Sequence, residues 1–102
     1  MQELTVLKTA PVLEIALSGE IDSKNADEFY DEVINAYRAA NCDVVFDCRD
    51  LEFIDSTTLG TFVKILKHVR EGGHGMKLIN TRPRLKKLFV ICALDTIMEI
   101  ES

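Results

Sequence analysis

Hydroxyl groups are concentrated in one short segment of this sequence, Ile54-Asp55-Ser56-Thr57-Thr58-Leu59-Gly60. The segment follows the apolar run at 44–46 and precedes residues with helical periodicity, so we expect it to form a strand-to-helix turn. Ser56 would then lie in the first turn of the helix, where free backbone N–H groups and the positive end of the helix dipole favour an anion. Four roles fit a serine in that place: a helix cap, a nucleophile, an attachment site for a carried group, and a phosphorylation switch.

The nucleophile and the carried group are the two roles that the rest of the sequence opposes. The G-x-S-x-G turn of serine hydrolases is absent around Ser56. Carrier proteins bear pantetheine on the serine of an Asp-Ser-Leu triplet, and the triplet here is Asp55-Ser56-Thr57, but those carriers are all-helical bundles. Strand-like runs at 12–17, 44–46 and 76–79 disagree with such a bundle. A plain cap stays open, although four consecutive capping-competent residues exceed what one helix requires.

No other segment has the pattern of a nucleotide or metal site. The sequence lacks both G-x-x-x-x-G-K-[ST] and a G-x-G-x-x-G loop after a strand, and the glycines at 72–75 are expected to end a helix. The two histidines do not share a helix face. The cysteines Cys42, Cys48 and Cys92 form no Cys-x-x-Cys pair, which indicates reduced thiols in a cytosolic protein. We therefore predict a protein with no enzyme activity, no cofactor and no metal.

Length and composition fit one globular domain covering residues 1–102. Of the 102 residues 47% are hydrophobic, and they are spread along the chain, which is enough for one core. The net charge of −5 argues against nucleic acid or an anionic membrane as the main partner. No apolar run approaches the roughly 20 residues of a membrane span, and the N-terminus lacks the layout of a signal peptide. We therefore expect a cytoplasmic protein that binds other proteins.

The elements that must position the Ser56 turn alternate between strand and helix. Two β-prone runs, 4–9 and 12–18, flank Ala10-Pro11 and indicate an N-terminal hairpin, with Asp22 or Ser23 as the candidate cap of the next helix. The later elements are expected in this order: a helix over 25–41, a strand at 43–47, a helix from the Ser56 turn to the glycines at 72–75, a strand at 76–79, a helix from Pro83, and an edge strand at 97–100. This alternation predicts an α/β domain with a mixed sheet and crossover helices.

Three motifs in order make the sequence resemble the STAS domain family, and within it the stand-alone bacterial anti-sigma factor antagonists. Leu17-Ser18-Gly19-Glu20-Ile21-Asp22 resembles the family's L-x-G-E-[LI]-D at the end of an early strand. Phe53-Ile54-Asp55-Ser56 resembles its F-[MI]-D-S signature, and the segment at 84–89 resembles the pattern of its third helix. The resemblance covers nearly the whole chain and implies a single-domain STAS-like fold.

The resemblance also implies a switch at Ser56. This serine matches the one that a partner anti-sigma factor, itself an ATP-dependent Ser/Thr kinase, phosphorylates in the family. There the unphosphorylated form binds the anti-sigma factor and releases the sigma factor, whereas the phosphorylated form does not bind until a phosphatase restores it. The partner-binding positions that the resemblance implies are Asp22, Asp55, Ser56, Thr57, Thr58 and Leu59.

One residue departs from the family pattern. The family usually has D-S-[SA]-G-L-G, and Thr58 stands at the first glycine position after the serine. A β-branched side chain is expected to restrict the backbone there and to add bulk where a kinase approaches. Three hypotheses therefore stay open: an anti-sigma factor antagonist switched at Ser56, a STAS-type scaffold subunit that binds proteins without phosphorylation, and a carrier protein modified at Ser56.

Overall fold

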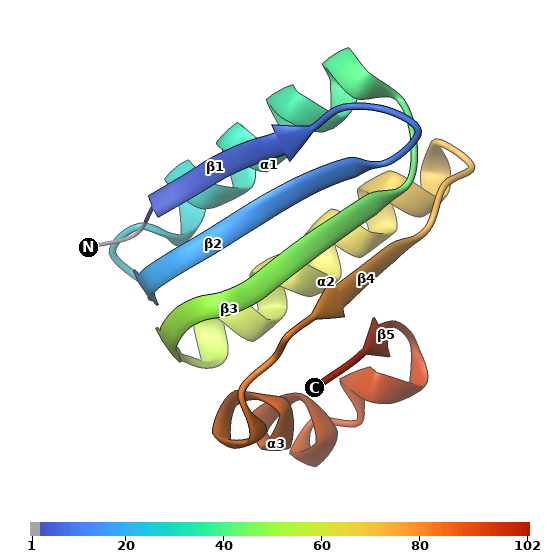
Figure 1. Ribbon diagram of the computed structural model, residues 1–102. Coiled ribbons are helices and arrows are strands. Elements are labelled where there is room, and N and C mark those ends of the chain that lie inside the picture. Colours follow the sequence, from blue (N-terminus) through green and yellow to red (C-terminus); the bar gives the residue numbers. More distant parts are fainter. Residues whose placement is uncertain (1–2) are drawn as a thin grey trace.

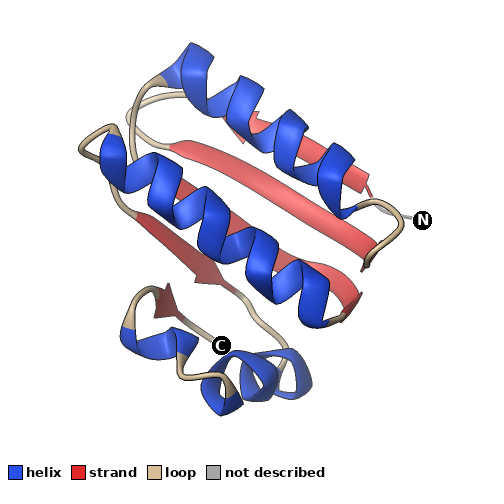
Figure 2. Cartoon of the chain, turned by 180° about the vertical axis from the view of Figure 1, so that it is seen from behind, coloured by secondary structure: helices blue, strands red, loops and turns tan. Residues whose placement is uncertain are grey.

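The computed structural model describes residues 3–102 and shows two long helices packed on one face of a five-stranded sheet (Figures 1 and 2). The strands are β1 (Glu3–Lys8), β2 (Leu13–Ile21), β3 (Val44–Ile54), β4 (Met76–Ile79) and β5 (Glu99–Ile100). The helices are α1 (Ala26–Ala40), α2 (Ser56–Glu71) and α3 (Pro83–Ile91), followed by the short 3-10 helix η1 (Leu94–Thr96). In Figure 2, α1 and α2 lie in front of the sheet, and α3 lies at its lower edge.

The sheet has the strand order β1-β2-β3-β4-β5, which is also the order in the chain. β1 pairs antiparallel with β2, and every later pair is parallel. Because each parallel pair is joined through a helix, this topology is an N-terminal hairpin followed by crossover units. The predicted α/β class with a mixed sheet is confirmed.

An aromatic cluster in the core fixes where α2 lies. The Phe62 ring of α2 is 5.4 Å from that of Phe29 in α1, 5.5 Å from that of Phe46 in β3 and 5.6 Å from that of Phe89 in α3, measured between centroids. All four side chains are fully buried. From Leu13 to Ser18 the side chains of β2 alternate between buried and half-buried positions, so one face of the sheet packs against these helices. The first half of α2 is therefore held by packing from three other elements.

Several predicted element bounds were wrong. The strand predicted at 43–47 extends to Ile54, because 50–54 pairs with the end of β2 and buries Leu51 and Ile54. The last strand covers only Glu99–Ile100, since the residues before it form η1 and a turn. Asp22 and Ser23 do not cap α1: the capping position is Asn25, and its side chain makes no cap hydrogen bond.

The C-terminus of α2 is closed by glycine, as predicted, but for a different reason at each position. Gly73 has a φ of +84°, which lies in the left-handed region. Gly72 has an ordinary φ of −81°, yet a Cβ atom there would lie 2.0 Å from the hydroxyl oxygen of Tyr37. That hydroxyl group is 2.7 Å from Nδ1 of His74. Gly72 is therefore required by the packing of Tyr37, not by its backbone conformation.

Candidate functional site

The candidate site lies at the carboxyl ends of β2 and β3, where the 22–25 loop leads into α1 and Asp55 leads into α2 (Figure 1). The two strands stay paired up to Ile21 and Ile54. The loop and the turn therefore begin side by side. This edge of a parallel sheet is a common place for binding sites, because the loops that follow the strands meet there.

Asp55, and not Ser56, caps α2. Its backbone is extended, with φ −121° and ψ −175°, and its Oδ1 accepts the N–H of Thr58 at 3.0 Å. Ser56 is the first residue of the helix and its side chain is exposed. Within residues 3–102 no hydrogen bond involves its hydroxyl group. The cap role that the sequence left open for Ser56 is thus taken by its neighbour, and the Ser56 hydroxyl group faces solvent.

The Asp55 carboxylate also ties the two loops together. Its Oδ2 accepts the backbone N–H of Ser23 at 3.0 Å, across 32 residues of sequence. Partial burial works against the ionised form, but hydrogen bonds outweigh it and lower the pKa of Asp55 below its ordinary value. The donors are the backbone N–H groups of Thr58, Ser23 and Thr57 and the hydroxyl group of Thr58. An ionised carboxylate therefore lies directly beside Ser56.

Thr58 does not have the exposed position that we predicted. Its side chain is fully buried, and its hydroxyl group lies within hydrogen-bond distance of the Ile21 carbonyl oxygen and of Asp55 Oδ1, the latter at 3.0 Å. The O–H donates to one of these acceptors at a time. Its contact with the Ile21 carbonyl links the start of α2 to the end of β2. The expectation of added bulk at the surface is wrong, since the side chain points into the fold.

The six predicted partner-binding residues fall into two groups. Ser56 and Thr57 are exposed, and Asp22 and Asp55 are partly exposed. Thr58 and Leu59 are buried, at 0% and 8% exposure. A partner that docks on the intact domain would therefore meet the first group, while the second holds α2 in place.

Sequence reasoning missed three residues at this site. Phe53, just before the turn, is 46% exposed although it is a large apolar side chain. Gly60 is exposed one helical turn after Ser56, and a Cβ atom there would have no neighbour within 4 Å. Asn25 holds the 22–25 loop, because its side chain accepts from the N–H of Asp22 at 2.8 Å and donates to the carbonyl of Glu20 at 3.0 Å. Two sequence signals were available: Phe53 stands in the F-[MI]-D-S signature, and Gly60 is a glycine inside a helical pattern at the last position of D-S-[SA]-G-L-G.

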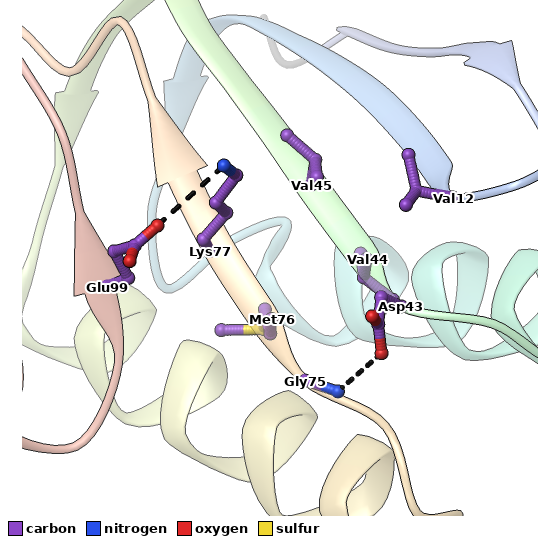
Figure 3. Close-up of a pocket in the computed structure, with 8 residues that line it drawn as sticks. All are labelled: Val12, Asp43, Val44, Val45, Gly75, Met76, Lys77 and Glu99. Atoms are coloured by element: carbon purple, nitrogen blue, oxygen red, sulfur yellow. Dashed lines mark hydrogen bonds and ion pairs between the residues drawn. The ribbon is translucent and has the colours of Figure 1, made fainter.

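The pocket in Figure 3 lies away from Ser56, at the amino ends of β3 and β4. It has a volume of about 380 Å³, and Val45 and Met76 are among its apolar lining residues. Its polar groups are already paired: Lys77 with Glu99 at 3.7 Å, and Asp43 with the N–H of Gly75 at 2.9 Å.

Among the described residues, no group of three His, Cys, Asp or Glu side chains is placed to hold a metal ion. In the same part of the chain, no helix has the length and apolar character that a membrane crossing needs.

Sequence comparison decides the family. The family model described as "STAS domain" matches residues 3–102 of this chain. This chain belongs to the STAS domain family. Among curated STAS relatives, the anti-sigma-B factor antagonist of Bacillus subtilis is 31% identical over 90 residues, covering 88% of this chain and 82% of the relative. The anti-sigma-B factor antagonist of Listeria monocytogenes is 32% identical over 91 residues, covering 88% and 79%.

Solved structures share the STAS fold at lower sequence identity. An anti-sigma factor antagonist from Mycobacterium paratuberculosis superposes with a TM-score of 0.82 at 19% identity, over 99% of this chain and 86% of the other. The anti-sigma factor antagonist SpoIIAA in its unphosphorylated form gives 0.78 at 19%, over 100% and 89%. Bacillus SpoIIAA in its phosphorylated form gives 0.71 at 19%, over 100% and 92%. The predicted STAS-like fold is therefore confirmed.

Proposed function

We propose that this STAS protein is an anti-sigma factor antagonist switched at Ser56. In the unphosphorylated state it binds an anti-sigma factor and so releases a sigma factor; phosphorylation of Ser56 by that partner ends the binding. The names of the curated relatives support the first statement. The observation that carries the second is that Asp55 performs the capping, which leaves the Ser56 hydroxyl group exposed at the first position of α2.

The geometry gives a physical reason for the loss of binding. A phosphate at Ser56 would add a charge of about −1.5 to −2 and three strong acceptor oxygens. Asp55 already accepts the N–H groups of Thr57 and Thr58, which are the groups that a helix start would otherwise offer to an anion. The phosphate would thus stay outside the fold, beside an ionised carboxylate. In a close-packed contact with a partner, the phosphate and the Asp55 carboxylate would both lose their hydration water without compensation, which weakens binding.

The proposal makes this chain a cytoplasmic binding protein and not an enzyme, and it needs no cofactor. Its partners would be an anti-sigma factor with Ser/Thr kinase activity and a phosphoserine phosphatase. The carrier hypothesis does not fit, because those carriers are all-helical and this chain has a five-stranded sheet. The scaffold hypothesis was raised because Thr58 was expected to obstruct a kinase, and the burial of Thr58 removes that argument.

The test is phosphorylation by the proposed partner, an anti-sigma factor with Ser/Thr kinase activity. The wild type, Ser56→Ala and Thr57→Ala are incubated with the kinase and ATP, and their intact masses are measured. One phosphate on the wild type and on Thr57→Ala, but none on Ser56→Ala, is expected. Calorimetry should show that Ser56→Ala binds the kinase and that Ser56→Glu binds at least tenfold more weakly. Tight binding of all variants without any phosphate would contradict the switch and favour the scaffold.

A further inference from the structure

α3 is a basic helix in an acidic protein. The net charge of the chain is −5, yet no Asp or Glu occurs from Met76 to Leu94. The basic residues in that segment are Lys77, Arg82, Arg84, Lys86 and Lys87. The charge of this part of the surface is therefore opposite in sign to that of the whole molecule, and the Ser56 switch does not use it.

One exposed face of α3 combines positive charge with apolar surface. Its members, which we call the α3 stripe, are Arg84, Lys87, Val90 and Ile91. Residues 84, 87 and 91 are three and seven positions apart, so they lie along one side of the helix. Val90 and Ile91 are 47% and 69% exposed, whereas Leu85 and Phe89 on the inner side are 2% and 0% exposed. The inner side already forms the core contact, so the outer apolar residues are not needed for it.

The charges of the α3 stripe have no ionic partner among the described residues, and a hydrogen bond positions one of them, Arg84. Within residues 3–102 the ion pairs join Lys8 with Glu14 and Lys77 with Glu99 and Glu101, and none includes Arg84 or Lys87. Arg84 donates from Nη2 to the main-chain carbonyl of Glu52. A guanidinium group has five N–H donors, and a bond to a carbonyl orients it without cancelling its charge. The remaining donors of Arg84 are thus available to a carboxylate on another molecule.

We propose that the α3 stripe is a second docking surface, and that its occupant is an acidic amphipathic helix of a partner protein. The stripe runs over 84–91, about 10 Å or two helical turns. Carboxylates on the first turn of the partner helix face Arg84 and Lys87, and apolar side chains on the next turn cover Val90 and Ile91. Nucleic acid and anionic membranes suit the stripe less well, because the remainder of the molecule repels them and half of the stripe carries no charge.

The position of the α3 stripe adds to this argument. Arg84 contacts the strand segment that leads into the Asp55 turn, because it bonds the carbonyl of Glu52. Figures 1 and 2 both place α3 at the end of the sheet where α2 begins. The docking surface therefore adjoins the Ser56 site without including it. Its chemistry depends only on charge and apolar area, so the proposal holds whether or not Ser56 is phosphorylated.

The experiment is an NMR titration of the ¹⁵N-labelled full chain with a synthetic probe. The probe is a capped helical peptide that repeats Glu-Glu-Leu-Leu, and the control peptide repeats Lys-Lys-Leu-Leu. Saturable shifts of the amide signals at 84–91 with the acidic peptide, weakened by salt, are expected. Arg84→Glu/Lys87→Glu should bind the probe at least tenfold more weakly. The matched control, Lys64→Glu/Lys67→Glu, changes the charge equally on the exposed side of α2 and should bind as the wild type does.

A second variant, Val90→Ser/Ile91→Ser, removes the apolar half without changing the charge and should also weaken binding. Because the stripe residues are exposed, all variants should keep the dispersed spectrum of the folded domain. The proposal is overturned if 84–91 show no saturable shift or if the lysine peptide binds equally well. It is also overturned if vesicles of phosphatidylglycerol capture the protein through these residues, or if α3 instead mediates a dimer that sedimentation detects and Arg84→Glu/Lys87→Glu abolishes.

Discussion

Gly60 is a glycine that the fold does not require. It lies inside α2 and is exposed, and a Cβ atom at this position would have no neighbour within 4 Å. It is not among the glycines with a positive φ. Since it follows Ser56 by one helical turn, both residues lie on the same face. We predict that Gly60→Ala stabilises the protein and at the same time weakens its binding to the anti-sigma factor.

The size of both effects follows from this geometry. Glycine in a helix interior costs about 0.5–1 kcal/mol relative to alanine, and here no clash reduces the gain. For a domain of this size that gain raises Tm by roughly 2–8 °C. If the partner packs closely on this face, the additional methyl group costs about 1–3 kcal/mol at the interface. That cost corresponds to binding roughly fivefold to 150-fold weaker.

Thermal unfolding followed by circular dichroism measures the stability, and calorimetry with the anti-sigma factor measures the affinity. Gly72→Ala is the matched control on the same helix, at the end remote from Ser56. Its Cβ atom would lie 2.0 Å from the Tyr37 hydroxyl oxygen, so this variant should lose stability while the folded fraction binds normally. A lower Tm for Gly60→Ala would refute the helix argument. A higher Tm with unchanged affinity would refute the contact argument.

Three further predictions concern Asp55 and Thr58 at the site and the cysteines elsewhere in the fold. Because the folded pKa of Asp55 is lowered, its contribution to stability is present above the ordinary value of about 3.9 and is lost as pH falls through the folded value. The difference in unfolding free energy between the wild type and Asp55→Asn in urea should therefore shrink below about pH 4. Thr58→Val keeps the shape but removes the hydroxyl donor that the Ile21 carbonyl and Asp55 share, and should cost about 1–3 kcal/mol in urea unfolding. Burial raises the pKa of Cys48 to about 12, so mass spectrometry should find a thiol reagent first on the exposed Cys92 and on Cys48 only after unfolding.

The order of the elements was readable from the sequence because each long element has its own hydrophobic period. The extension of β3 was not, since the charged residues Arg49, Asp50 and Glu52 hide the strand pattern, while the backbone pairs with β2 regardless of these side chains. The position of Ser56 at the helix start was also predictable. The buried orientation of Thr58 and the bond between Ser23 and Asp55 were not, because the partners are 37 and 32 residues apart in the chain. Local sequence carries no information about such contacts.

The Asp55 carboxylate has a consequence for how phosphate would reach Ser56. A general base must accept the proton of the attacking hydroxyl group, and its strength falls as its pKa falls. The lowered pKa of Asp55 makes it a weak base, and both its oxygens already accept hydrogen bonds from the protein itself. The nearest carboxylate to Ser56 in sequence is therefore unsuited to activate it. In phosphoryl transfer the kinase would have to supply the base as well as the nucleotide, so the modification would proceed at the pace of the partner and not by autonomous reaction of the exposed serine.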